Sequence, residues 1–290
     1  MSRDLGIVFA GGGNRAFYQL GLMNRWAERL LPRTAVIAAC SAGACVAVIL
    51  LSERQETTHR FWLARRRHVT KNFEWRRLLR GERPTPHAPI YRDTVIHSMR
   101  EGGLERLRAQ PFPVLVITSR FPRLLPATGA VALGLGAYSL GKRLWPGEIH
   151  PRLPRRLGFS PAIFDARKCQ TPEEVADLII ASSATPPFTP IGRFASEALL
   201  DGGLVDSAPA FVAESEPTVR RSVVLLTRPY PAEATGAQGK RLYVAPTEPV
   251  PVERWDYTRP ELVRATIEMG ERESVTHEAM LEQWLLHDRG

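Results

Sequence analysis

The amino-acid sequence predicts a single α/β domain over residues 1–290, a three-layer sandwich with helices on both faces of a central, mainly parallel sheet. Short apolar runs of strand length alternate along the chain with longer segments of helical periodicity. The first two runs each end in a turn of small residues that leads directly into a helix. This repeat requires parallel neighbouring strands, because a crossover must return the chain to the start of the next strand. With 290 residues, 44% of them hydrophobic, the chain can bury a large core.

Each predicted element follows from its local pattern. Residues 5–10 are apolar and are interpreted as the first strand, and residues 16–31 place apolar side chains along one helical stripe that ends at Pro32. Residues 35–40 form the second strand, and the apolar run 44–51 belongs to the helix that follows it. The later elements are a helical region at 53–100, strands at 113–118 and 161–165, a helix that Thr171-Pro172-Glu173-Glu174 opens and that runs over 175–182, a strand at 222–227, a loop at 229–252 and a helix at 260–287.

The corner between the second strand and its helix carries a serine, in the sequence Ala39-Cys40-Ser41-Ala42-Gly43. Small residues stand two positions before and two positions after Ser41, as a nucleophile elbow requires, because larger side chains would collide with the crossing strand and helix. The N-terminus of a helix then points at the hydroxyl, where backbone N–H groups stabilise negative charge. The alternative is a tight helix start capped by a serine.

A catalytic serine needs a base, and Asp201 is the candidate. It follows Leu199-Leu200 and precedes Gly202-Gly203, which places it at the end of a strand with open backbone around it. None of the seven histidines lies in the loop after a late strand where an α/β-hydrolase histidine would sit. A buried aspartate in direct contact with the serine can serve instead. The alternative for Asp-Gly-Gly is a hairpin turn.

The first strand ends in Gly11-Gly12-Gly13-Asn14-Arg15. Successive glycines can turn several backbone N–H groups towards one anion, such as the oxyanion that forms during ester cleavage. Arg15 adds a cation at the start of a helix, where it opposes the helix dipole and so suggests a role outside the helix, with a salt bridge as the alternative. A competing interpretation of Gly11-x-Gly13-x-x-Ala16 is an NAD(P)-binding fingerprint of an oxidoreductase, although the second strand lacks the acidic residue that NAD binding needs.

Four segments, in this order, resemble the patatin-like phospholipase family. They are 11–15, 39–43, Ala181-Ser182-Ser183-Ala184-Thr185-Pro186-Pro187-Phe188 and 201–203, and they span residues 5–210. The resemblance implies a hydrolase that cleaves carboxylic esters of phospholipids or lysophospholipids through an acyl-enzyme, without a cofactor or metal. A non-catalytic lipid-binding protein of the same fold is the alternative.

The resemblance also assigns roles to residues. It implies Ser41 as the nucleophile and Asp201 as its base. It implies an oxyanion hole and supporting positions formed by Gly11, Gly12, Gly13 and Ala42, with Arg15, Gly43, Gly202 and Gly203. Ala39 and Ala16 depart from the family pattern, because each replaces a glycine by a residue one methyl group larger.

Two further segments suggest contact with a membrane surface. The net charge of +9 is concentrated at 54–100, which holds twelve Lys or Arg residues against four acidic ones and includes Arg65, Arg66 and Arg67. Residues 124–143 are apolar, too short and glycine-rich for a transmembrane helix, and flanked by cations, so they are interpreted as a lid, a core helix or a membrane-contact segment. Within the domain we therefore expect a basic helical region at about 53–110 beside an apolar lid or membrane-contact segment.

The remaining composition fits a cytoplasmic protein, peripheral to a membrane. The three cysteines, Cys40, Cys45 and Cys169, show no C-x-x-C spacing, so neither a disulfide framework nor a zinc site is predicted. The N-terminal apolar run is too short for a signal peptide. A lipid ester is the expected partner, and no nucleic acid is expected.

Overall fold

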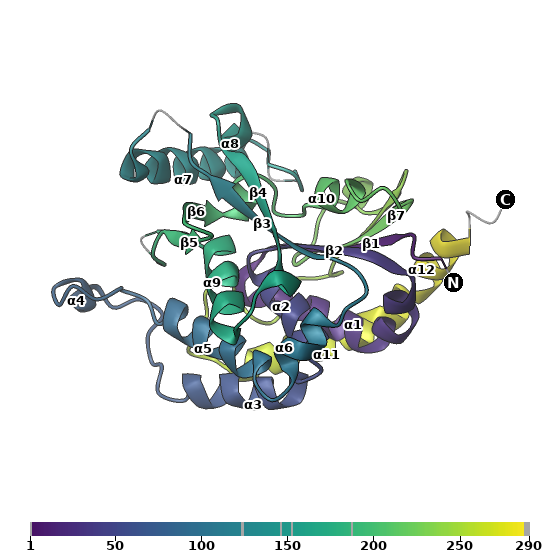
Figure 1. The fold of residues 1–290 in the computed structure, drawn as a ribbon, viewed down its shortest axis with the longest axis horizontal. Helices are drawn as coiled ribbons and strands as arrows, with labels where there is room; N and C mark the ends of the chain where they lie inside the picture. The colour runs from purple at the N-terminus through teal and green to yellow at the C-terminus, as the bar shows by residue number, and fades with distance from the viewer. Residues whose placement is uncertain (1, 123–124, 146, 152, 187, 287–290) are drawn as a thin grey trace.

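The structure is a computed structural model that describes residues 2–122, 125–145, 147–151, 153–186 and 188–286. The strands in this part of the chain form one mixed sheet with the order β5-β6-β3-β2-β1-β7-β9-β8, and β4 pairs with β3 (Figure 1). The central strands β3, β2, β1, β7 and β9 are parallel, while β4, β5, β6 and β8 pair antiparallel at the sides. The strands are β1 (Leu5–Phe9), β2 (Thr34–Cys40), β3 (Val114–Arg120), β4 (Ser160–Asp165), β5 (Gly192–Phe194), β6 (Glu197–Asp201), β7 (Arg221–Leu225), β8 (Gly236–Gln238) and β9 (Arg241–Val244).

The central strands are buried on both faces, and this explains why they are apolar runs rather than alternating patterns. On β1, Ile7 and Phe9 point into one hydrophobic core, while Val8 points into a second core on the other face. On β2, Ile37 and Ala38 divide between the two cores in the same way. The predicted α/β class with a mainly parallel sheet is therefore confirmed.

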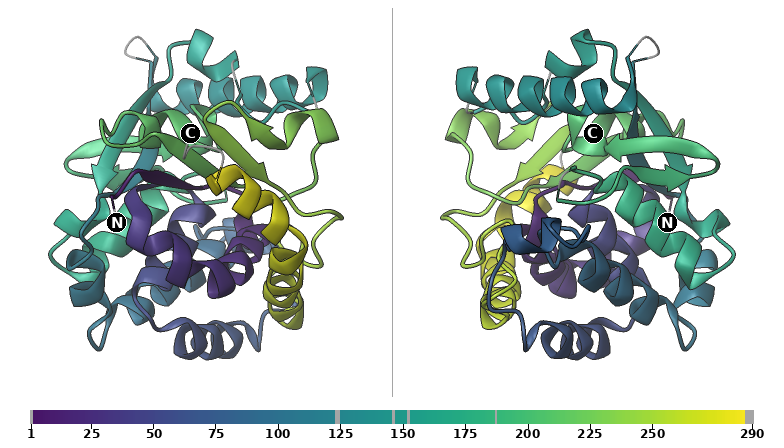
Figure 2. Two further views of the ribbon diagram at one scale, coloured as in Figure 1. Left: turned by 90° about the vertical axis from the view of Figure 1, so that its right-hand side faces the viewer. Right: turned by 90° about the vertical axis from the view of Figure 1, so that its left-hand side faces the viewer.

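Helices cover both faces of the sheet, as Figures 1 and 2 show. The larger core packs under α1 (Phe17–Leu30), α2 (Ala42–Leu51), α3 (Gln55–Arg66), α5 (His87–Met99), α6 (Gly103–Arg108), α9 (Pro172–Ser182), α11 (Glu261–Thr276) and α12 (Glu278–Leu286). The opposite face carries α7 (Ala127–Leu144), α8 (Leu153–Arg156) and α10 (Ala210–Glu214), and α4 (Trp75–Leu78) projects from one side of the molecule.

Two predicted elements differ in the C-terminal third. The segment 229–252, expected as a loop, contains β8 and β9, and β9 extends the parallel sheet beside β7. These strands are only three and four residues long, so the surrounding Pro and Gly residues obscure their pattern. The expected terminal helix is two helices, α11 and α12, which meet at His277.

Within the basic run at 65–67, Arg65 and Arg67 are exposed but Arg66 is buried, and this corrects the predicted membrane contact through Arg66. The Arg66 side chain is buried, donates from Nε to the carbonyl oxygen of Tyr257 at 3.0 Å, and lies over the rings of Trp62 and Tyr257. Arg65 pairs with Asp93. In both views of Figure 2, α3 lies on the opposite side of the sheet from α7, so these segments do not share one face.

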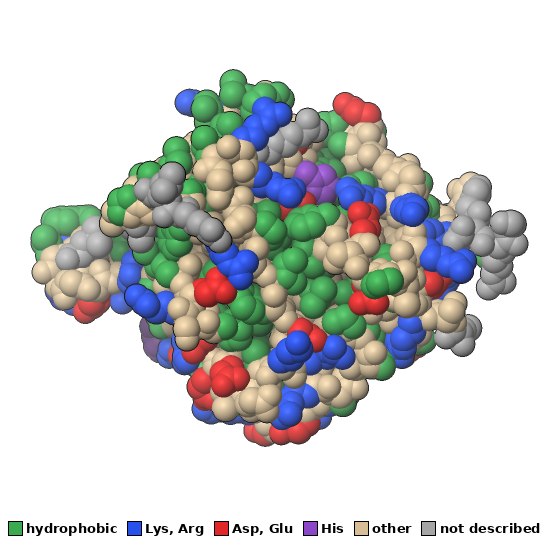
Figure 3. All heavy atoms as spheres, turned by 45° about the horizontal axis from the view of Figure 1, so that its top comes forward, with side chains coloured by type: hydrophobic (Ala, Val, Ile, Leu, Met, Phe, Trp, Pro, Cys, Tyr) green, Lys and Arg blue, Asp and Glu red, His purple; other side chains and the backbone are tan. Residues whose placement is uncertain are grey.

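Helix α7 contains most of the apolar segment predicted at 124–143; residue 124 itself lies outside the described residues. One side of α7 packs on the domain so closely that a Cβ atom at Gly134 would lie 2.8 Å from the Phe159 ring. The other side exposes Leu133, Leu140 and Leu144. On the face seen in Figure 3, hydrophobic side chains and Lys or Arg side chains lie together over the upper part of the molecule. Among the described helices, none combines the length and the apolar character that crossing a bilayer requires.

Candidate active site

Ser41 lies at a sharp corner between β2 and α2. Its backbone has φ 53° and ψ −126°, a strained conformation for a residue with a side chain and the one that a nucleophile elbow imposes. Gly43 makes the corner possible, because a Cβ atom there would lie 2.5 Å from the carbonyl oxygen of Phe9 and 2.6 Å from that of Ala10. Ala39 is fully buried in the larger core, so its methyl group is accommodated beside the elbow.

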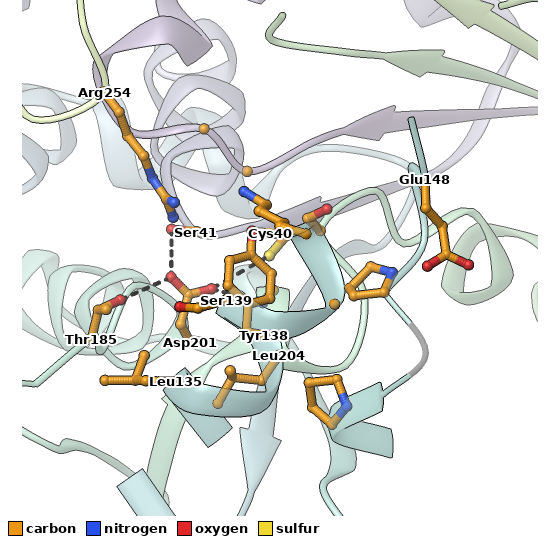
Figure 4. A pocket seen from close by; sticks show the side chains of 18 of the residues that line it. Cys40, Ser41, Leu135, Tyr138, Ser139, Glu148, Thr185, Asp201, Leu204 and Arg254 are labelled. Carbon is orange, nitrogen blue, oxygen red and sulfur yellow. Dashed lines mark hydrogen bonds between the residues drawn. The ribbon is translucent and has the colours of Figure 1, made fainter. Parts of the chain in front are cut away.

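Asp201 ends β6, where it lies opposite Thr118 of β3, and its side chain meets Ser41 (Figure 4). Ser41 Oγ is 3.2 Å from Asp201 Oδ2, and both residues are only 7% exposed. Thr185 Oγ1 donates to the same oxygen at 3.2 Å, and the N–H of Gly203 donates to Oδ1 at 2.7 Å. The structure thus brings together two predicted residues that are 160 positions apart in the sequence.

Burial raises the pKa of the Asp201 carboxyl above its usual range. The Arg254 guanidinium opposes this shift most strongly, and the hydrogen bonds from Gly203, Ser41 and Thr185 oppose it further. A carboxylate whose proton affinity is raised in this way is a better base than an exposed aspartate, while the nearby cation keeps it from remaining neutral.

The serines of the 181–188 segment support the elbow. The N–H of Ser41 donates to Ser182 Oγ at 2.8 Å, and Ser182 Oγ donates to the carbonyl oxygen of Ile117 at 2.6 Å. Ser183 Oγ lies 3.3 Å from Ser41 Oγ. From the sequence, this segment was noted only for its resemblance to the family. The contacts of its serines could not be predicted, because they depend on where α9 ends against β3.

The glycine loop lies beside Ser41. The N–H of Gly11 donates to the carbonyl oxygen of Ser207 at 2.7 Å, so Gly11 shapes the loop and its N–H is not available to an oxyanion, contrary to the prediction. Gly12 lines the same cavity as Ser41, and Arg15 Nε donates to its carbonyl oxygen at 3.3 Å. Gly13 has φ 60° and packs against the backbone of Arg254.

Three N–H groups remain for an anion. Within the described part of the chain, the N–H groups of Gly12, Gly13 and Ala42 have no acceptor. Ala42 is the first residue of α2, so its N–H also carries the positive end of the helix dipole. Gly202 is close-packed, because a Cβ atom there would lie 2.3 Å from the carbonyl oxygen of Ile117.

A cavity of about 360 Å³ opens over Ser41 and Asp201. This volume is typical of a small-molecule site. Much of its lining is apolar and includes Leu135, Ile149, Leu153, Phe188, Leu204 and Trp255. Helix α7 contributes the side chains of Leu135 and Tyr138 to this lining. The cavity can hold an apolar chain with one end at Ser41.

Four cations also line this cavity, and we call Arg15, Lys142, Arg228 and Arg254 the cationic cluster. Only Arg15 was expected from the sequence. Lys142 lies in the last turn of α7, Arg228 follows β7, and Arg254 precedes α11, so no local motif connects them. The acidic residues that line the cavity in the described part of the chain are Asp201 and Glu148.

No histidine in the described residues lines the cavity. His87 is buried elsewhere and contacts the Tyr257 hydroxyl, and burial lowers its pKa to about 3. His150 Nδ1 pairs with the Asp206 carboxylate at 2.9 Å. Across the described ranges, no three His, Cys, Asp or Glu side chains are grouped closely enough to hold a metal ion.

Three comparisons with known proteins were made, and one of them identifies a family. No curated protein matches the chain. A solved structure, the crystal structure of VipD from Legionella pneumophila, is similar with a TM-score of 0.49 and 13% identity, covering 97% of this chain and 67% of that one. A family model described as patatin-like phospholipase matches residues 7–214, which include the elbow, the glycine loop and Asp201. The chain therefore belongs to the patatin-like phospholipase family, whose members are lipid acyl hydrolases.

Proposed function

We propose that this protein is a serine hydrolase that cleaves carboxylic esters of phospholipids or lysophospholipids, with Ser41 as nucleophile and Asp201 as its base. The observation that carries the proposal is the contact of 3.2 Å between Ser41 Oγ and Asp201 Oδ2 in the floor of a largely apolar cavity. The raised pKa of Asp201 supports its role, because the carboxylate gains affinity for the proton that the serine must lose.

The proposed reaction has two halves. Asp201 accepts the hydroxyl proton while Ser41 Oγ attacks the ester carbonyl, and the N–H groups of Gly12, Gly13 and Ala42 stabilise the oxyanion. The C–O bond to the alcohol then breaks, and the proton on Asp201 passes to the leaving oxygen. In the second half Asp201 takes a proton from water, whose oxygen attacks the acyl carbon. The bond between this carbon and Ser41 Oγ then breaks, the fatty acid leaves, and the proton passes from Asp201 back to Ser41 Oγ.

We further propose that α7 contacts a lipid surface. Its inner side lines the cavity, while Leu133, Leu140 and Leu144 recur at helical spacing on the exposed side. Lys142 and Arg143 follow at the end of the helix, where cations favour an anionic surface. A substrate leaving the membrane would then meet the cavity directly beneath this helix.

Family membership favours the hydrolase over NAD(P) binding by the Gly11–Gly13 loop. The other alternative, a lipid-binding protein without catalysis, requires an experiment. A fluorophosphonate probe should label the protein in a one-to-one ratio, and Ser41→Ala should abolish labelling. Ser139 also faces the cavity but has no carboxylate acceptor in the described structure, so Ser139→Ala is the control and should still be labelled. Absence of labelling in the folded wild-type protein would contradict the proposal.

A further inference from the structure

The cationic cluster is an unusual concentration of like charge for one cavity. Arg15, Lys142, Arg228 and Arg254 come from four separate segments and converge beside Ser41. Elsewhere in the protein arginines meet carboxylates, as in the pairs Arg120–Glu197 and Arg241–Glu214. Across the described residues, Arg15, Lys142 and Arg254 form no ion pair with a carboxylate, and the Nε of Arg254 is buried without a hydrogen-bond partner. These side chains therefore keep donors available to a ligand.

The cations of the cluster also act on one another. Burial, and then the charges of Arg254, Arg228 and Arg15, lower the pKa of Lys142 to about 7, although one side of this residue is open to solvent. Burial and the charges of Arg254 and Arg228 likewise lower the pKa of Arg15. Because such mutual repulsion costs free energy, an anion bound among these cations would relieve it.

The aromatic side chains of the cavity argue against a cationic headgroup. Recognition of a quaternary ammonium group uses the faces of aromatic rings. Here Lys142 Nζ lies 4.5 Å from the centre of the Tyr138 ring. Arg228 Cζ is 3.9 Å from the centre of the Tyr230 ring, and Arg254 Cζ is 5.1 Å from that of Trp255. The protein's own cations therefore cover the ring faces that a choline group would need.

We propose that Lys142, Arg228 and Arg254, together with Arg15, bind the phosphate of a lipid headgroup that carries net negative charge, so that the protein prefers phosphate-monoester lipids to zwitterionic choline lipids. This proposal rests on the proposed hydrolase function. Arginine forks suit phosphate oxygens, which accept two parallel hydrogen bonds from each guanidinium group. The acyl chain then lies along the apolar lining while its ester reaches Ser41.

Two of the side chains proposed to select the headgroup lie outside the region that matches the family model. Arg228 and Arg254 lie beyond residue 214, where the family match ends. Arg254 also contacts the glycine loop through its backbone, since its carbonyl oxygen accepts the N–H of Asn14 at 3.0 Å. The C-terminal segment thus places a headgroup contact directly against the proposed oxyanion site.

The test uses monomeric lysolipids that share one acyl chain: lysophosphatidate, lysophosphatidylcholine and monoacylglycerol. We expect kcat/KM for lysophosphatidate to exceed that for lysophosphatidylcholine about tenfold or more, as the loss of a charge-assisted contact implies. Lys142→Gln and Arg228→Gln should each reduce this ratio severalfold. Arg156→Gln is the matched control, because Arg156 is exposed on α8, on the same face of the sheet as α7, but does not line the cavity. It should keep the wild-type ratio.

Three outcomes separate the hypotheses. Equal kcat/KM for all three lysolipids would overturn the anion site while leaving the hydrolase intact. If the folded protein hydrolyses none of them and is not labelled by fluorophosphonate, the hydrolase function fails, and saturable binding of lysophosphatidate that weakens in Lys142→Gln would still support the site. Competition by inorganic phosphate as strong as that by lysophosphatidate would overturn the lipid assignment in favour of free phosphate.

Discussion

The polar groups around Ser41 and the cationic cluster line the same cavity but are organised in opposite ways. Ser41, Asp201, Thr185 and Gly203 bond to one another, so the buried carboxylate has partners on both oxygens. In the cluster, Lys142 and Arg254 face other cations and aromatic rings. A fully hydrogen-bonded network holds a fixed geometry, whereas Lys142 and Arg254, which form no ion pair with a carboxylate in the described residues, can bind an anion. The two proposals use this difference: the groups around Ser41 would perform the chemistry, and the cationic cluster would select the substrate.

The largest effect is expected among the hydrogen-bonded groups around Ser41. Asp201→Asn should lower kcat about 10³- to 10⁴-fold, because the amide cannot accept the serine proton. The same change should raise the thermal stability at neutral pH, since burial raises the pKa of Asp201 and its ionised form is costly in the folded state. Ester hydrolysis and calorimetric Tm measure both effects.

The sign of this stability effect depends on pH. Between the ordinary pKa of an aspartate and the raised pKa of Asp201, the folded protein binds more protons than the unfolded chain, so wild-type stability falls as pH rises. The stability gain of Asp201→Asn should therefore be larger at pH 8 than at pH 4. An Asn variant that is less stable than the wild type at both pH values would show that the carboxylate stabilises the fold.

An intermediate effect is expected for Arg254, the member of the cationic cluster that acts on Asp201. Arg254 is the strongest influence that lowers the pKa of Asp201, so Arg254→Gln should raise this pKa further and move the acid limb of kcat/KM to higher pH. A neutral, water-soluble ester separates this effect from headgroup binding. Arg228→Gln removes the same charge from a side chain that stacks on Tyr230, and we expect a smaller shift. Equal shifts in the two variants would mean that the pKa of Asp201 responds only to the net charge of the cavity.

The smallest effect is expected for vesicle binding by the exposed side of α7, the helix that also contributes Lys142 to the cationic cluster. Replacing Leu140 and Leu144 by serine should weaken co-sedimentation with anionic vesicles about fivefold, because less apolar surface enters the interface. The comparison variant Arg65→Gln/Arg67→Gln changes the exposed cations at the C-terminal end of α3, on the other side of the sheet, and should bind as the wild type does. A larger loss in the α3 variant would move the contact surface to that helix.

The local features of the candidate active site could be predicted from the sequence. The strand–turn–helix pattern around Ser41 and the glycine loop depend on backbone conformations that only small residues adopt, and such requirements are visible in a short segment. The same holds for the central strands, whose burial on both faces leaves uninterrupted apolar runs such as 35–40. The short strands β8 and β9 escaped prediction, because three or four residues between prolines and glycines carry little periodicity.

The positions of the charged side chains in the folded protein were the hardest feature to predict from the sequence. The arginine run at 65–67 drew attention as a membrane patch, yet Arg66 is a buried structural cation that bonds to the backbone of the 256–257 loop. By contrast, Lys142, Arg228 and Arg254 are scattered singly along the sequence and became a cluster only through folding. A charged side chain gives no local sign of which distant surface it will face.

The sequence by itself determined the fold class, the elbow at Ser41 and the small-residue turns around it, because each follows from backbone sterics within a few residues. Only the tertiary structure decided that Asp201 reaches Ser41, since this contact depends on β6 pairing with β3. It also decided that the N–H of Gly11 is already bonded and that four distant cations share one cavity. These outcomes depend on how separate elements pack, and that packing is set by the whole core rather than by any single segment.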